Sequence, residues 1–508
     1  RFKGEGLLAL GRGEEAEAAF RESLANGGSP GDAGAGIVRA LIAQNKIPAA
    51  RAELDKLSAQ AAGEANLLVL QSEFAARAGD FAAAEQHLAA ALKTPDAAAD
   101  ALLRIRLLAA ITDVQLTQRN IAGARATLEQ LKKLTGESPL YNLLAGRTDL
   151  ADGKTKDAIG RLQAFNRDIP DNLQGKVLLG AAYLSENSVA QALGQLEGAL
   201  AMAPSSPQAR LLLGQAQLQG GKPQDTLRTL APLLAANPPS PQAVILAGRA
   251  RMASGEAAEG IDLLRDSAAA NPDDVALKLE LATGYLAAGQ QDKALAVLAG
   301  LKSTGTDDLR RQWLTVLAHA SKRDLKSADA ALKKLLDANP KNPALLNLAG
   351  AFYRNTGRVP EAKKVFEQAL AANAKDTGAL IALAQLSAAD GDDKAAQNYL
   401  TRVLAVDPVN GPALDGLARG ALAEQNADVA VAIVQKARDA DPKAIPPRVL
   451  LVRWLGIAGR HDEAVNAARE MITLAPQDQR VAGEAAAAFV RAGKYQEALT
   501  QYNNAIAL

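Results

Sequence analysis

The 508-residue chain has 57 basic and 56 acidic residues, which gives a formal net charge of +1. This near-neutral balance provides no global electrostatic basis for binding nucleic acid or an anionic membrane surface. The chain has no cysteine, which excludes disulfides and thiolate metal ligands, and no apolar run reaches the roughly 18 residues typical of a membrane-spanning helix. Hydrophobic residues make up 48% and aromatic residues 3%, so we expect a core built mainly of closely packed alanine and leucine.

One pattern returns along the whole chain at a fixed interval. It is seen in "GKTKDAIGRL" from Gly153 and in "GRVPEAKKVF" from Gly357. We call the first residue of each copy the marker of its repeat. Successive markers are 34 residues apart, except for one step of 40 residues between Gly79 and Arg119. The fifteen markers are Gly11, Asn45, Gly79, Arg119, Gly153, Asn187, Gly221, Gly255, Gly289, Arg323, Gly357, Gly391, Gln425, Gly459 and Gly493.

The residues around each marker predict two helices. Glycine or asparagine at the marker can adopt the left-handed conformation that ends a first helix. Five residues later stands a small residue, and nine residues later a larger apolar one in every repeat except the fourteenth, which has Ala468. These two positions are four residues apart and therefore share one face of a second helix. Eight repeats carry proline seventeen residues after the marker, where the second helix ends or the next repeat begins.

The step of 40 residues places a six-residue insertion near residues 93–104. Thr94, Pro95 and Asp96 have the character of a helix start, and no helix breaker follows until about Arg119. We therefore predict an unusually long first helix, of about 22 residues, in the fourth repeat.

This 34-residue pattern resembles the tetratricopeptide repeat (TPR) family. In the sixth repeat the residues that carry the resemblance are Leu179, Gly180, Tyr183, Asn187, Ala192, Leu196, Ala199 and Pro204. The resemblance implies an all-α fold, a right-handed α-solenoid superhelix of about fifteen helical hairpins. It also implies that this solenoid is continuous over residues 1–508, with no separate catalytic domain.

In TPR proteins the first helices line a concave groove, and this resemblance indicates where a ligand would bind. Arginine recurs at one equivalent position in four repeats, and its forked donors suit carboxylates, sugars or acidic peptides. The alternative is that these arginines simply solvate a polar face. The candidate groove residues are Arg147, Gln215, Arg249, Asn347, Gln385, Asp415, Arg419 and Arg453, with Trp313 as an aromatic platform. If the groove binds an acidic polysaccharide, Arg249→Ala combined with Arg419→Ala should weaken that binding.

The sequence offers no arrangement typical of catalysis. His87, His319 and His461 lie in distant repeats and at three different phases of the pattern. The acidic run "DGDD" at 390–393 lacks the ligand spacing of a calcium loop and suits helix capping instead. We find no phosphate-binding glycine loop, nucleophile elbow or zinc spacing. We therefore predict that the chain is not an enzyme and uses no catalytic residue, cofactor or metal.

The last third of the chain resembles a particular group of TPR proteins. The segment "PKAIPPRVLL", Pro442 to Leu451, departs from the general repeat and is similar to TPR lipoproteins of bacterial PEP-CTERM/exosortase systems, which accompany exopolysaccharide gene clusters. This resemblance implies a protein–protein interaction scaffold on the periplasmic side of the bacterial envelope, anchored by a lipidated segment before Arg1.

The same resemblance sets the expected partners. They are proteins of polysaccharide synthesis, export or protein sorting, and the expected ligands are a polysaccharide or an acidic peptide, with no nucleic acid. The alternative is a cytoplasmic location, as the substrate-recruiting arm of a larger enzyme or regulatory complex.

Overall fold

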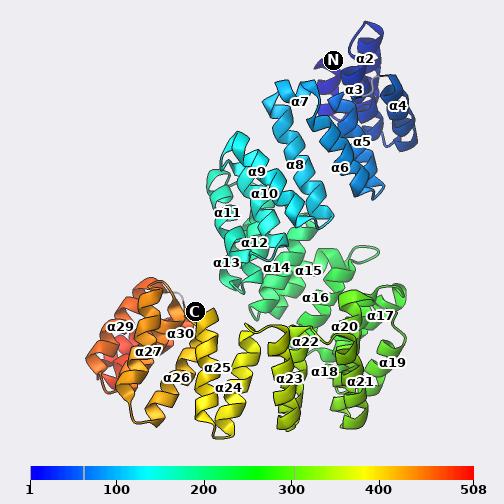
Figure 1. Ribbon diagram of the computed structural model, residues 1–508. Helices are drawn as coiled ribbons and strands as arrows, with labels where there is room; N and C mark the ends of the chain where they lie inside the picture. Colours follow the sequence, from blue (N-terminus) through cyan, green and yellow to red (C-terminus); the bar gives the residue numbers. More distant parts are fainter. Residues whose placement is uncertain (1, 61–62, 303, 477, 508) are drawn as a thin grey trace. The chain divides into compact units, whose positions relative to one another are not determined.

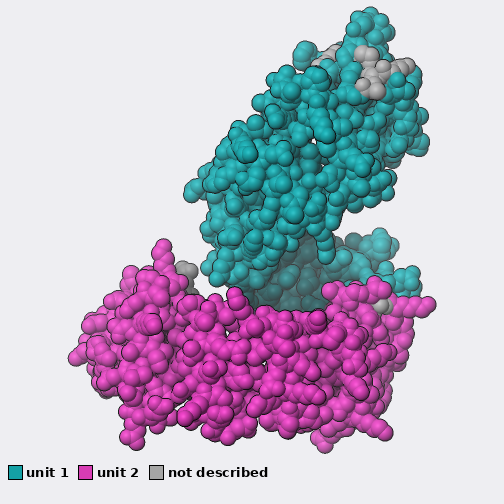
Figure 2. Space-filling view, in the orientation of Figure 1, with its two compact units in different colours: residues 1–288 teal, residues 289–508 magenta. Residues whose placement is uncertain are grey.

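The computed structural model describes residues 2–60, 63–302, 304–476 and 478–507, and these residues form 31 α-helices and no strand (Figure 1). The expected all-α fold is therefore confirmed. The chain divides into two compact bodies, which we call the N-terminal body (residues 1–288) and the C-terminal body (residues 289–508; Figure 2). Whether they form one continuous solenoid stays a prediction.

The helices follow the predicted alternation of first and second helices. Those of the N-terminal body are α1 (Phe2–Ala9), α2 (Gly13–Ala25), α3 (Pro30–Ala43), α4 (Ile47–Gln60), α5 (Ala65–Arg77), α6 (Phe81–Leu92), α7 (Pro95–Ala99), α8 (Ala101–Thr117), α9 (Ile121–Thr135), α10 (Pro139–Ala151), α11 (Thr155–Asp168), α12 (Leu173–Ser185), α13 (Val189–Met202), α14 (Pro207–Gln219), α15 (Pro223–Leu234), α16 (Pro241–Ala253), α17 (Ala257–Ala270) and α18 (Val275–Ala287). Those of the C-terminal body are α19 (Gln291–Ala299), α20 (Gly305–Ser321), α21 (Leu325–Ala338), α22 (Pro343–Asn355), α23 (Val359–Ala372), α24 (Thr377–Ala389), α25 (Asp393–Val406), α26 (Gly411–Ala423), α27 (Ala427–Ala440), α28 (Ile445–Ile457), α29 (His461–Leu474), α30 (Gln479–Arg491) and α31 (Tyr495–Ala507).

All fifteen markers adopt the left-handed backbone conformation, with φ between 55° and 84°. Glycine does so at little cost because it has no Cβ. Arg119, Arg323 and Gln425 adopt the same conformation without that freedom, at a cost of roughly 1 kcal/mol each. The position in the repeat therefore overrides the local preference of the residue.

The predicted small and large positions form the core. The small residue five positions after the marker is buried in all fifteen repeats. The residue nine positions after the marker is buried in every repeat except the last, where Tyr502 is 44% exposed. The large residue packs against a glycine of its own first helix in several repeats. A Cβ at Gly180 would lie 2.5 Å from Leu196, and one at Gly350 would lie 2.6 Å from the Phe366 ring. Glycine is thus required for the two helices of these repeats to approach.

Helix ends are also fixed by side chains. Pro204, Pro272 and Pro340 lie in turns between a second helix and the next first helix, as predicted. Many first helices are capped by the side chain of the residue that precedes them. Asp274, for example, accepts a hydrogen bond from the amide of Leu277 at 2.9 Å. Such caps satisfy amides that have no partner within the helix.

The prediction of one long helix in the fourth repeat was wrong. The insertion forms the short α7 and the 17-residue α8, which meet at Asp100. The Asp100 carboxylate accepts hydrogen bonds from the amides of Leu102 (2.8 Å) and Leu103 (3.2 Å). A short acidic side chain can compete for backbone amides in this way, and it starts a new helix where the sequence pattern showed no breaker.

Candidate functional site

The nine predicted groove residues lie on first helices at only two positions of the repeat. Trp313, Asn347 and Asp415 stand ten residues before their markers, and the other six stand six residues before theirs. The two positions are about one helical turn apart and share a face. We call this surface the first-helix face. Arg147, Gln215 and Arg249 belong to the N-terminal body, and the remaining six residues to the C-terminal body.

Two of the predicted arginines are paired with acidic side chains from the next repeat. Arg249 donates two hydrogen bonds to Glu280, at 2.7 and 2.6 Å, and the Glu280 side chain is only 3% exposed. Arg453 bonds Glu484 at 2.8 Å in the same way. In each pair the partners are 31 residues apart, which places both ion pairs at equivalent junctions. The hydrogen bonds to Glu280 and Glu484 raise the pKa values of the two arginines.

Other predicted residues are engaged in a similar way. Arg147 forms an ion pair with Asp113 of the preceding first helix. Asn347 donates to the carboxylate of Asp376 at 2.9 Å. These four polar side chains of the first-helix face therefore connect neighbouring repeats, while the predicted role of the face in binding a ligand stays a prediction.

Trp313 and Gln215 are both half-buried. The Trp313 ring packs edge-on against Phe352, with ring centroids 6.4 Å apart, and joins a core cluster of the C-terminal body. This contact gives Trp313 a packing role in addition to the predicted one.

Three predicted residues meet at one pocket. Gln385, Asp415 and Arg419 line a hollow of about 510 Å³ between α24, α25 and α26. The Asp415 carboxylate accepts hydrogen bonds from Arg419 (2.8 Å) and from the indole of Trp454 (3.2 Å). Gln385 accepts one from Arg354 at 3.0 Å. The pocket is therefore bordered by polar groups whose positions are fixed by their neighbours.

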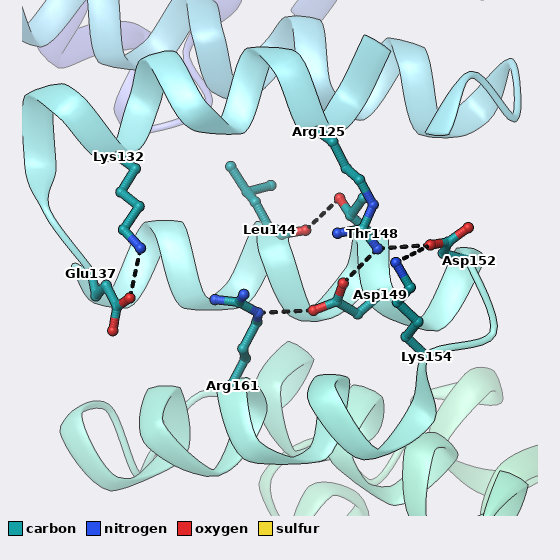
Figure 3. A network of polar contacts seen from close by, with 9 residues as sticks. All are labelled: Arg125, Lys132, Glu137, Leu144, Thr148, Asp149, Asp152, Lys154 and Arg161. Carbon is teal, nitrogen blue, oxygen red and sulfur yellow. Dashed lines mark hydrogen bonds and ion pairs between the residues drawn. The ribbon is translucent and has the colours of Figure 1, made fainter. Parts of the chain in front are cut away.

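Sequence reasoning missed a buried polar cluster of the N-terminal body (Figure 3). Asp149 on α10 is 3% exposed and lies between Arg125 of α9 and Arg161 of α11, each 2.8 Å away. Arg125 also bonds Asp152 (2.8 Å), which in turn pairs with Lys154 (3.0 Å). The hydrogen bonds from Lys154 and Arg125 hold the pKa of Asp152 below its usual range.

A signal for this cluster was present in the sequence. Asp149 stands four residues before its marker, where Tyr183, Tyr285 and Tyr353 stand in other repeats. A carboxylate at a core position requires partners. Arginines on the second helices before and after α10 could supply them.

The remaining polar candidates have local roles. His319 is half-buried, and its Nδ1 lies 3.6 Å from an Asp324 carboxylate oxygen. Asp392 caps α25 by accepting from the amide of Ala395 at 3.0 Å. Over the described part of the chain, no cluster of three or more histidine and acidic side chains could hold a metal ion. Among the same residues, none of the helices is sufficiently long and apolar to span a bilayer.

Comparison with known families supports the repeat assignment. Two sequence models described as tetratricopeptide repeat match the chain, one over residues 183–250, 251–320, 319–386 and 356–420, the other over residues 143–207. Together these matches span residues 143–420. No curated protein matches the sequence.

Several solved structures are similar at low sequence identity. The crystal structure of the APC/C hetero-tetramer Cut9–Hcn1 has a TM-score of 0.39 and 13% identity, covering 89% of this chain and 95% of that chain. A tetratricopeptide repeat protein from Parabacteroides merdae has a TM-score of 0.36 and 17% identity, covering 54% of this chain and 93% of that chain. Yeast Tom70 has a TM-score of 0.37 and 13% identity, covering 80% of this chain and 93% of that chain.

Proposed function

Because the chain belongs to the tetratricopeptide repeat family, we propose that it is a non-catalytic protein–protein interaction scaffold of the bacterial envelope. In this role it supports exopolysaccharide assembly or export, or protein sorting, through partners in those machineries. The repeat family supports the scaffold part of the proposal, since stacked helical hairpins present extended binding surfaces. The segment Pro442 to Leu451, with its resemblance to envelope lipoproteins, supports the location.

The observation that carries the scaffold role is the first-helix face. Its arginines and carboxylates pair with one another, as Arg249 does with Glu280 and Arg453 with Glu484. Such pairing fixes side chains across repeat junctions and gives the face a defined shape. A surface of this kind suits recognition of a partner, because a preorganised face loses less conformational entropy on binding.

The location is tested by fractionating cells that express the tagged full-length protein, followed by protease treatment from the periplasmic side. We expect to find the protein in the membrane fraction. We also expect the protease to digest it in cells in which only the outer membrane has been permeabilised. A periplasmic protein and a cytoplasmic protein of the same cells serve as controls. Recovery in the soluble fraction, protected from protease until lysis, would contradict the envelope role and favour a cytoplasmic recruiting arm.

The polysaccharide link is tested separately. Deleting the gene should lower secreted exopolysaccharide, and the wild-type gene should restore it, because a scaffold aligns partners that otherwise meet slowly. Cross-linking of the intact cells should then recover proteins of the export machinery with the scaffold. Unchanged secretion in the deletion strain would remove this part of the proposal and leave the interaction scaffold.

A further inference from the structure

The pocket between α24, α25 and α26 is bordered by two glycines of α26. Five residues before the marker, α22, α24 and α28 carry the large buried side chains of Phe352, Leu386 and Trp454, whereas α26 carries Gly420. In most of the other repeats this position is alanine or glycine. Nine residues before the marker, α26 has Gly416 where α28 has the buried Leu450. Both glycines line the pocket, but a Cβ at Gly416 would lie 2.7 Å from Leu400, whereas one at Gly420 would come no closer than 3.3 Å to Gln397. The unfilled space therefore lies beside Gly420.

The hollow beside Gly420 has an apolar wall. Ile381, Ala384, Leu400 and Pro412 line it, and its volume of about 510 Å³ lies in the ~300–1,000 Å³ range of ligand pockets. The neighbouring first helices α22, α24 and α28 carry phenylalanine, leucine or tryptophan at the position of Gly420. A bulky apolar group supplied by a partner would take the place of the side chain that α26 lacks, and its burial would be favourable.

The border of the pocket offers one amide donor and one amide acceptor. The Gln385 carbonyl is occupied by Arg354, which leaves its NH₂ group as the donor. Gln397 donates to Glu424 at 3.4 Å, which leaves its carbonyl oxygen as the acceptor. A peptide unit carries one N–H and one C=O, so this pair of groups matches a partner's backbone.

The charge at the border is negative. Asp393 and Asp415 line the pocket together with Arg419, and Arg419 is paired with Asp415 at 2.7 Å. Asp393 thus carries the excess charge. Including the ionic residues that bond the border glutamines, Arg354 and Glu424, leaves the excess at one negative charge. Charge complementarity favours a cation beside the apolar group.

We propose that this pocket binds a partner's peptide segment in which a tryptophan, phenylalanine or leucine side chain fills the space beside Gly420, with a neighbouring lysine or arginine facing Asp393. The inference rests on the proposed interaction-scaffold function and adds the chemistry of the partner. It differs from the acidic peptide expected from the sequence, because Arg419 is already paired with Asp415.

The probe is the peptide Gly-Lys-Trp-Lys-Gly-amide with a fluorophore attached to its N-terminus. It is titrated with the full chain, and binding is measured as the increase in fluorescence anisotropy. Two matched peptides replace Trp by Ser or both Lys by Glu. We expect binding of the Lys-Trp-Lys peptide to be at least tenfold tighter than that of either matched peptide. Equal binding of the Ser peptide would overturn the apolar anchor, and tighter binding of the Glu peptide would overturn the basic partner.

The variant Gly420→Leu tests the location. It restores the side chain that neighbouring repeats carry, and the nearest atom to a Cβ there is Gln397 Nε2 at 3.3 Å, on a half-buried side chain that can move. We expect the variant to fold and to lose at least tenfold in affinity. Gly483→Leu on α30, where a Cβ meets nothing within 4 Å, is the matched control and should bind like the wild type.

A second variant tests the proposal independently, in case Gly420→Leu does not fold. Asp393→Lys leaves the apolar wall intact, and we expect it to reverse the preference between the Lys and Glu peptides. Unchanged affinity in Gly420→Leu, or unchanged preference in Asp393→Lys, would refute the proposal. These outcomes are independent of the fractionation experiment, since a cytoplasmic scaffold could still bind the peptide and an envelope scaffold could fail to.

Discussion

The two bodies of the molecule solve the same packing problem in different ways. The position four residues before the marker lies on the first helix of every repeat. In the N-terminal body the first three repeats have apolar residues there, and the last six have Gln115, Asp149, Tyr183, Gln217, Arg251 and Tyr285. In the C-terminal body they are His319, Tyr353, Ser387, Ala421, Leu455 and Phe489. One row is largely polar and the other ends in apolar residues, although the fold is the same.

The difference shows that this position accepts either chemistry if its neighbours match. Gln115 donates to Glu85 at 2.7 Å and accepts from Thr127 at 2.9 Å, and Asp149 is held by two arginines. Phe489 needs only apolar neighbours and is 2% exposed. The N-terminal body should therefore be sensitive to the loss of single polar partners, and the C-terminal body to the loss of side-chain volume.

Phe489→Ala should have the largest effect. Removing a buried phenylalanine leaves a cavity and costs about 3–5 kcal/mol of unfolding free energy. Because Phe489 packs in the terminal cluster with Trp454 and Val481, the loss should appear first as faster amide exchange in α28 to α31. Hydrogen-exchange mass spectrometry on the full chain measures this, and unchanged exchange in those helices would contradict the volume argument.

Asp149→Ala should cost somewhat less, about 2–3 kcal/mol, because it leaves Arg125 and Arg161 without their shared buried carboxylate. Both arginines are partly exposed, so water replaces some of the lost interaction. Exchange should rise in α9 to α11 and stay unchanged in the C-terminal body. Asp157→Ala, an acidic residue of α11 without a role in the cluster, is the control substitution; equal effects of the two would count against the cluster.

A smaller, pH-dependent effect is expected at Asp152. Its pKa in the folded chain is lowered by Lys154 and then Arg125, so its contribution to stability is full above its unfolded pKa of about 4 and disappears as the pH falls through the folded pKa. Asp152→Asn should therefore raise exchange in α9 to α11 slightly at pH 7 and make no difference near pH 2. A difference that grows on acidification would reverse the assigned sign.

The last predicted effect is a gain in stability. The Oε1 atom of Gln217 is buried and has no hydrogen-bond partner among the described residues. An unsatisfied buried polar atom costs about 1–3 kcal/mol, and Gln217→Leu would remove that atom at nearly constant size. We expect the melting temperature of the chain to rise by one to a few degrees, or exchange in α14 to slow. A loss of stability would show that the amide is satisfied by water.

The sequence was sufficient for features that lie within one repeat. The period, the left-handed markers and the buried small and large positions are all encoded within 34 residues, so the pattern identified them. The division into α7 and α8 at Asp100 was not predicted, because it depends on the hydrogen bonds of a single capping carboxylate. The Arg249–Glu280 ion pair was not predicted, because its two residues belong to successive repeats and come into contact only when these repeats stack. The pocket at Gly420 could not have been found by comparing equivalent first-helix positions, because most other repeats also carry alanine or glycine there.

The close contact between Gly180 and Leu196, or between Gly350 and Phe366, lies inside a single repeat, so each of these two hairpins contains both residues of the contact. A hairpin of this kind can be duplicated, deleted or exchanged as a module without losing that contact. The ion pairs that span junctions, such as Arg453 with Glu484, do not have this freedom, because each requires a particular neighbour. Contacts within a hairpin thus leave the order of the repeats free, whereas the ion pairs between repeats fix which repeats can be neighbours.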